Sequence, residues 1–162
     1  AQIDHADLAA HAGNLERRVG LLDDVDLDRQ IPSLSRHQVI AGMARVAALI
    51  GDGHTNIAPT RDTAIGFRTL PVKLYSFKDG WFVRSATRPR ASLVGAKVLR
   101  IGQAPPEEAY RRVREIIGRD NDMGGRFFAP FLLAMPAVLH AQGRSEVWQV
   151  IEAIRVRREE RR

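Results

Sequence analysis

Apolar side chains in the first third of the chain recur at the spacing of an α-helix. Six of them recur at intervals that line one helix face: Val39, Ile40, Met43, Val46, Ala47 and Ile50. Ser35 and Gln38 match the capping box that begins a helix, and Gly51 matches the glycine that ends one. The pattern therefore predicts a helix between Ser35 and Gly51.

The pattern changes to that of β-strands after Thr55. Residues 70–77 alternate between apolar and polar side chains, Lys78-Asp79-Gly80 is typical of a tight turn, and residues 81–84 can return as a partner strand. A further short strand is predicted between Gly95 and Gly102. A β-hairpin followed by one more strand is the expected arrangement.

Helical spacing returns after two consecutive prolines. Pro105 and Pro106 precede Glu107 and Glu108, and prolines and acids are favoured in the first turn of a helix. The apolar residues that follow predict one buried stripe, with Gly118 as its end: Ala109, Tyr110, Val113, Ile116 and Ile117. Residues 124–143 predict a helix in two pieces, each restarted by a proline, Pro130 or Pro136.

The two ends of the chain have weaker patterns. Ala1 to about Asp28 has helical spacing interrupted by glycines, and an extended link is expected to end at Pro32. Near the other end, residues 147–154 fit one helix face, although residues 154–157 alternate equally well as a strand. Both readings of that end stay open.

These elements together predict an α+β fold. A helical region covers residues 1–58, a small β-rich module covers residues 59–122, and helices follow in residues 123–162. Apolar residues make up 44% of the 162-residue chain, which is enough to bury a core. Prolines interrupt the longest apolar stretch, so no membrane-spanning helix of roughly 20 residues is predicted.

Composition narrows the chemistry. With no cysteine, the chain has neither disulfides nor thiolate metal ligands, and no cofactor motif is present. The chain begins with Ala1 rather than methionine, as a trimmed or exported mature protein would, so its compartment stays undetermined with export as one option.

The net charge of +6 is unevenly distributed, and five arginines lie within the last eight residues. Such a tract can attract nucleic acid through its long-range field. However, Glu159 and Glu160 interrupt it, and no aromatic residues are interleaved to stack on bases. A solvated terminus is the favoured reading, and nucleic acid is not the expected partner.

The sharpest local motif is Gly51-Asp52-Gly53-His54-Thr55. It places His54, a candidate general base, on a glycine-flanked turn directly after the predicted helix, with Asp52 as a candidate to orient its imidazole. The alternative is a purely structural turn in which Asp52 and Thr55 satisfy backbone groups.

The remaining histidines have no recognisable metal-ligand spacing, and we predict structural roles for them and no metal site. They are His5, His11, His37 and His140. The sequence has no Gly-x-Ser-x-Gly elbow, no Ser-x-x-Lys pair and no glycine-rich phosphate loop. A nucleophile is therefore not evident among the 162 residues.

Three segments in this order resemble the tail-specific, or carboxyl-terminal-processing, serine peptidases, especially their tricorn-like branch. They are residues 48–55 (Ala-Leu-Ile-Gly-Asp-Gly-His-Thr), the hairpin of residues 70–83, and residues 95–102 with the helix that opens at Pro106. The family combines a helical amino-terminal region, a PDZ-like module and an α/β catalytic core. The resemblance covers residues 15–143.

The resemblance implies that residues 59–122 form the PDZ-like module and that residues 123–162 lead toward a catalytic core absent from this sequence. His54 would then be the base for a serine supplied from outside the chain, which would be inactive alone. A polypeptide substrate or peptide terminus is the implied partner. It would bind beside the helix of residues 109–117, where Arg111 or Arg112 could favour an acidic terminus.

Two other readings remain open: a free-standing peptide-binding or interaction module, and a pseudoenzyme that has lost its chemistry. The carboxylate-binding loop typical of PDZ domains is not found, since residues 91–95 (Ala-Ser-Leu-Val-Gly) are a poor substitute.

Overall fold

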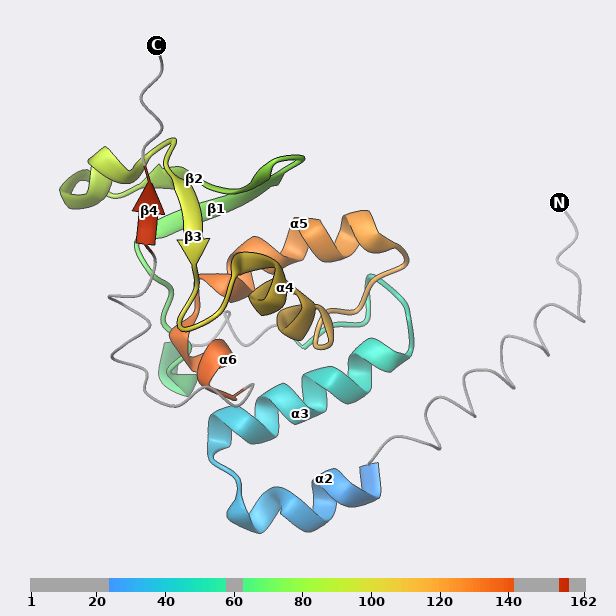
Figure 1. The fold of residues 1–162 in the computed structure, drawn as a ribbon. Helices are drawn as coiled ribbons and strands as arrows, with labels where there is room; N and C mark the ends of the chain where they lie inside the picture. The colour runs from blue at the N-terminus through green and yellow to red at the C-terminus, as the bar shows by residue number, and fades with distance from the viewer. Residues whose placement is uncertain (1–23, 58–62, 142–154, 158–162) are drawn as a thin grey trace, which may run out of the picture.

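A computed structural model of the chain describes residues 24–57, 63–141 and 155–157 (Figure 1). The α-helices are α2 (Asp24–Gln30), α3 (Arg36–Leu49), α4 (Pro106–Arg114), α5 (Asp122–Leu133) and α6 (Pro136–Ala141). The strands are β1 (Val72–Phe77), β2 (Gly80–Ala86), β3 (Lys97–Arg100) and β4 (Arg155–Arg157). Short 3₁₀ helices cover Ile31–Ser33, Thr63–Ile65 and Arg88–Leu93.

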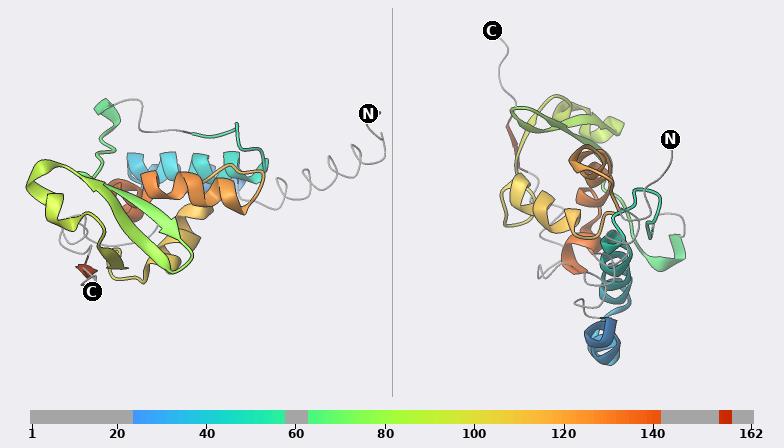
Figure 2. Two further views of the ribbon diagram at one scale, coloured as in Figure 1. Left: turned by 90° about the horizontal axis from the view of Figure 1, so that it is seen from above. Right: turned by 90° about the vertical axis from the view of Figure 1, so that its right-hand side faces the viewer.

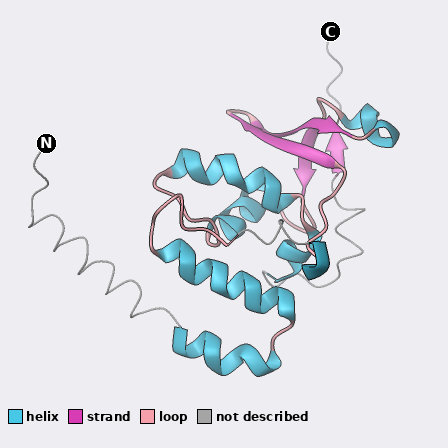
Figure 3. Ribbon diagram, turned by 180° about the vertical axis from the view of Figure 1, so that it is seen from behind, coloured by secondary structure: helices cyan, strands magenta, loops and turns pink. Residues whose placement is uncertain are grey.

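The fold is α+β, with helices before and after an antiparallel sheet. The strand order is β1-β2-β3-β4, so β1 lies at one edge. Helices α4 and α5 lie on one side of the sheet, α6 and α3 come next, and α2 lies farthest from the sheet (Figures 1 and 2). The view from behind shows the strands at one end of the molecule and α2 and α3 at the other (Figure 3).

The helix predicted after Ser35 is confirmed with its capping box. The Ser35 side chain accepts from Gln38 N, and Gln38 Oε1 accepts from Ser35 N at 2.9 Å. The helix ends before Gly51, whose φ of 77° is costly for residues with a Cβ. Capping and termination were both readable from local sequence because they depend on neighbouring residues.

The buried face of α3 differs from the prediction. Ala41, Ala44 and Ala48 are its buried residues, whereas Met43 and Ile50 are 50% and 42% exposed. Small alanine side chains let another helix approach closely, and α6 is in contact with α3. The side of α3 with small side chains is therefore buried, and the larger Met43 stays exposed.

The hairpin and the strand after it are confirmed, with Lys78 and Asp79 in the turn and Phe77 paired with Gly80. Beneath the sheet, Trp81 is 1% exposed, and its Nε1 donates to Glu107 Oε1 at 2.9 Å. Its ring lies 5.6 Å from the Tyr110 ring of α4. The buried stripe predicted for this helix is also confirmed, with Val113 0% exposed.

Several predicted boundaries were wrong. Pro32 lies in a 3₁₀ helix rather than an extended link, and α4 ends at Arg114, four residues before Gly118. Pro136 does restart the chain as α6, but Pro130 lies inside α5.

At the chain ends, the strand reading holds for residues 155–157, while residues 1–23 and 142–154 lie outside the described residues. Among the residues described, no helix is long and apolar enough to cross a membrane.

Trp81→Ala tests whether the tryptophan anchors the sheet to α4. Removing this buried ring should lower the free energy of unfolding by about 3–5 kcal/mol, because it leaves a large cavity. Phe77→Ala is the control, since Phe77 is 54% exposed and should cost about 1 kcal/mol. Urea unfolding followed by circular dichroism measures both, and equal losses would contradict the central place of Trp81.

Candidate functional site

The Gly51–Thr55 turn is organised around the carboxylate of Asp52. Asp52 Oδ1 accepts from the backbone N of His54 at 3.0 Å, and Asp52 Oδ2 accepts from Thr55 Oγ1 at 2.6 Å. These are the bonds of an Asx-type turn, so the structural role considered for Asp52 and Thr55 is present. The same bonds fix the backbone that carries His54.

The His54 ring is presented to solvent with one nitrogen facing Asp52. Its Nδ1 lies 3.3 Å from Asp52 Oδ1, and its side chain is 95% exposed. When Nδ1 carries the proton and donates it to the carboxylate, Nε2 is the nitrogen that can accept a proton from another group. The motif thus brings its two predicted site residues together in a base-and-orienter arrangement.

The pKa of Asp52 is lowered, first by the hydrogen bond from Thr55 and next by the backbone N–H of His54. Both contacts favour the ionised carboxylate. Because the pKa is lower in the folded than in the unfolded chain, this stabilisation is present above the unfolded pKa and is lost as pH falls through the folded one. Asp52 is therefore charged at neutral pH, as an orienting group needs to be.

A second loop, far away in sequence, holds the turn in place. Asp120 Oδ1 accepts from Gly53 N at 2.9 Å, and Asn56 Oδ1 accepts from Gly118 N at 2.8 Å. Asn56 Nδ2 also donates to Gly53 O at 2.6 Å. We call this set the turn latch, and it joins the end of α3 to the loop between α4 and α5.

The contact between the two loops requires glycine at position 118, because there is no room for a side chain there. A Cβ at this position would lie 2.2 Å from Thr55 O and 2.7 Å from Asp52 O, both of which are backbone atoms. The sequence predicts Gly118 only as the end of a helix. No signal in a single sequence pairs it with residue 55, because the contact depends on tertiary structure.

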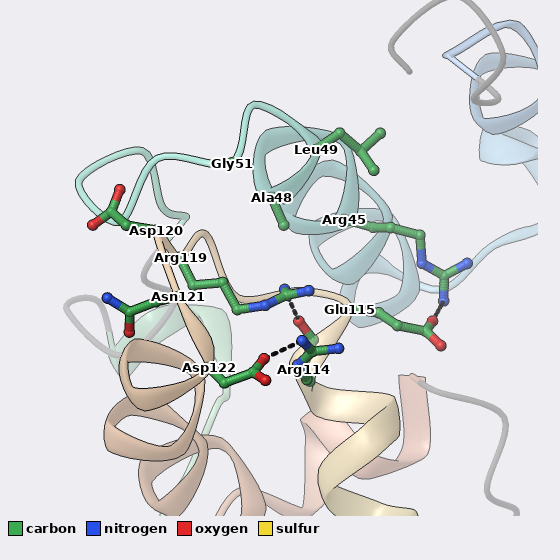
Figure 4. Close-up of a pocket in the computed structure, with 10 residues that line it drawn as sticks. All are labelled: Arg45, Ala48, Leu49, Gly51, Arg114, Glu115, Arg119, Asp120, Asn121 and Asp122. Carbon is green, nitrogen blue, oxygen red and sulfur yellow. Dashed lines mark hydrogen bonds and ion pairs between the residues drawn. The ribbon is translucent and has the colours of Figure 1, made fainter. Parts of the chain in front are cut away.

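A polar hollow of about 660 Å³ lies beside the turn latch, between the end of α3 and the α4–α5 loop (Figure 4). Charged side chains that line this hollow form ion pairs with one another. Arg45 lies 3.4 Å from Glu115, and Arg114 pairs with Asp122. Arg119 donates to the carbonyl oxygens of Arg114 and Ile117, at 2.7 and 3.0 Å. These contacts support the loop that carries Asp120.

The predicted peptide-binding arginines lie on α4, away from the turn. Arg112 lies 2.6 Å from Glu108 in an ion pair along the helix, and Arg111 is exposed. The opposite, apolar side of α4 is buried at Ala109 and Val113. A peptide site at these arginines stays a prediction.

His37 has the contacts of a structural residue: its Nε2 lies 3.1 Å from Ile65 O, and its ring packs edge-on against Phe67. His140 lies in α6, while His5 and His11 are outside the described residues. In the described ranges, no group of three or more potential metal-binding side chains occurs.

Comparison of the chain with protein-family models, with curated proteins and with solved structures gives no match.

Thr55→Val tests the cause of the Asp52 pKa shift. It removes the shortest hydrogen bond to the carboxylate while keeping the side-chain shape, so the pKa of Asp52 should rise toward its ordinary value. His54→Ala should raise it less, because the backbone N–H of residue 54 remains. Carboxyl-carbon NMR titration of the folded chain measures both, and a larger effect of His54→Ala would refute this order.

Gly118→Ala tests the turn latch. The added Cβ must push apart two backbone segments, so the variant should lose about 1–3 kcal/mol of unfolding free energy. Gly124→Ala is the matched control, because its Cβ would meet nothing closer than 3.7 Å and alanine favours the helix. Equal unfolding midpoints for both variants in urea would show that the close approach at Gly118 is absent.

Proposed function

We propose that this chain is the amino-terminal, substrate-handling part of a serine peptidase of the tail-specific, tricorn-like kind. The single observation that carries the proposal is the pairing of Asp52 with Nδ1 of an otherwise exposed His54. A general base needs this combination of an orienting carboxylate on one nitrogen and access for a reactant on the other. The serine would come from polypeptide outside residues 1–162.

In the proposed reaction, His54 Nε2 accepts the hydroxyl proton of that serine as the serine oxygen attacks a peptide carbonyl. Asp52 holds the imidazole in the Nδ1-protonated tautomer and stabilises the imidazolium that forms. The exposed ring would have to be covered by the segment that carries the serine, because a water-excluded site strengthens these interactions. The chain alone is accordingly proposed to be inactive.

The turn latch supports this proposal in energetic terms. An exposed turn normally samples many conformations, and a misplaced base loses much of its catalytic effect. The bond from Gly53 N to Asp120 and the bond from Gly118 N to Asn56 tie the turn to the α4–α5 loop, so the backbone that carries His54 is preorganised. A merely structural turn is the competing reading, since the same bonds would stabilise a pseudoenzyme equally well.

A PDZ-like role for the β1–β2 hairpin, β3 and α4 belongs to the same proposal. The elements follow the order that the resemblance implies, with a hairpin, a strand and then a helix packed through Trp81 and Tyr110. A free-standing peptide-binding module remains the second candidate function, and a groove described below favours peptide binding in either case.

His54→Gln tests the base assignment in the longer natural polypeptide that the proposal requires. Turnover of an unstructured protein substrate should fall by about 10²- to 10⁴-fold, because proton transfer from the serine is lost. Folding stability should be unchanged, since the side chain is 95% exposed. Lys78→Gln, at the exposed hairpin turn, is the matched control.

Near-normal turnover of His54→Gln would remove His54 from the reaction. A natural polypeptide no larger than residues 1–162, measured by intact mass, would remove the peptidase proposal altogether. In that case the peptide-binding module becomes the favoured function.

A further inference from the structure

A groove of about 440 Å³ runs between the edge strand β1 and helix α5. It is lined by residues from both faces of β1, such as Lys73 and Leu74, and by Phe127, Pro130 and Phe131 of α5. Helix α5 is in contact with β1 and lies next to the hairpin in Figure 1. This groove is separate from the turn that carries His54.

The α5 wall of the groove exposes aromatic rings to water. Phe127 and Phe131 lie one helical turn apart and are 65% and 53% exposed, with ring centroids 6.4 Å from each other. Burying such rings against a ligand is favourable because it removes apolar surface from water. Clustered exposed apolar surface with a polar rim is typical of an interaction site.

The rim of the groove is cationic. Lys73, Arg84 and Arg126 line it, whereas no Asp or Glu is among its described lining residues. Arg126 is already engaged, with Ser76 Oγ at 2.9 Å and Glu107 Oε1 at 3.4 Å. Lys73 on β1 would provide the charge that selects an acidic partner, and Arg84, whose guanidinium lies 5.4 Å from the ring centroid of Tyr75, would add to it.

The strand that forms the other wall is suited to accept a further strand. In the described sheet β1 pairs only with β2, so every second residue of β1 directs its backbone N–H and C=O away from that neighbour. Such an edge is a template for an added extended segment.

Helix α5, and not α4, lines this groove. Arg126 of α5 reaches Ser76 on β1, and its guanidinium lies 4.8 Å from the ring centroid of Tyr110 on α4. Helix α5 thus packs against both elements and occupies the space between them. A peptide that adds to β1 would contact α5 rather than α4.

We propose that the groove binds an extended acidic peptide as a strand beside β1. Side chains of a strand alternate between its two faces. Apolar side chains of the peptide would meet Phe127 and Phe131. The acidic ones between them would face Lys73, as opposite charges on adjacent strands do, with the charge of Arg84 one strand farther away on β2. This site would extend the proposed substrate-handling function. The identification of the peptide as a substrate rests on that proposed function.

Fluorescence anisotropy with the chain alone tests this binding. The probe is a labelled ten-residue peptide that alternates valine with aspartate, compared with one that alternates valine with lysine and one with the same valines and aspartates in two blocks. We expect the alternating acidic peptide to bind best. Lys73→Glu should weaken that binding by about fivefold or more and favour the lysine peptide instead.

Phe131→Asp should weaken binding of the acidic peptide by about tenfold or more, because it places a charge in the apolar wall. Lys78→Glu, in the hairpin turn outside the groove, is the matched charge-reversal control and should leave binding unchanged. Circular dichroism checks that each variant is folded. Equal binding of all three peptides, or equal effects of Lys73→Glu and Lys78→Glu, would overturn the proposal.

Two further outcomes would also overturn it. If no peptide binds and sedimentation shows a dimer that Phe131→Asp dissociates, the groove is a contact between copies of the chain. If no peptide binds and the chain is monomeric, the groove is not a peptide site. Neither result bears on His54, whose test requires the serine-containing polypeptide, so the two proposals can fail independently.

Discussion

The close approach of two backbone segments at Gly118 is the constraint on which the arrangement of this protein depends. The loop after α4 can reach the turn after α3 only because residue 118 has no side chain, since a Cβ would lie 2.2 Å from Thr55 O. The hydrogen bonds of Asp120 and Asn56 form around that contact. Helix α4 lies beneath the sheet, and the loop that follows it is thereby bonded to the turn that carries His54.

This constraint also explains why the structural and the catalytic readings of the Asp52 turn are compatible. The carboxylate binds the backbone N of His54 and the hydroxyl of Thr55, and one of its oxygens also faces the His54 ring. The carboxylate that fixes the turn backbone is therefore also within reach of the His54 ring. The same hydrogen bonds therefore serve a purely structural turn and the orientation proposed for His54.

Helix α5 has a comparable influence on the other side of the molecule. It packs against both α4 and β1, and Arg126 contacts both. Its inner side contributes the fully buried Ala129 and Leu133, while Phe127 and Phe131 remain exposed beside the edge strand. A single amphipathic helix therefore closes the space next to α4 and forms one wall of the groove at β1.

The sequence by itself determined the features that depend on near neighbours: the capping box at Ser35, the hairpin turn before Gly80, the buried stripe of α4 and the glycine-flanked position of His54. Tertiary structure decided what depends on distant partners. The buried alanine face of α3, the fit at Gly118 and the groove between β1 and α5 all arise from contacts between elements far apart along the chain. Periodicity records which side of an element is apolar, but the identity of what packs against it is a property of the folded chain.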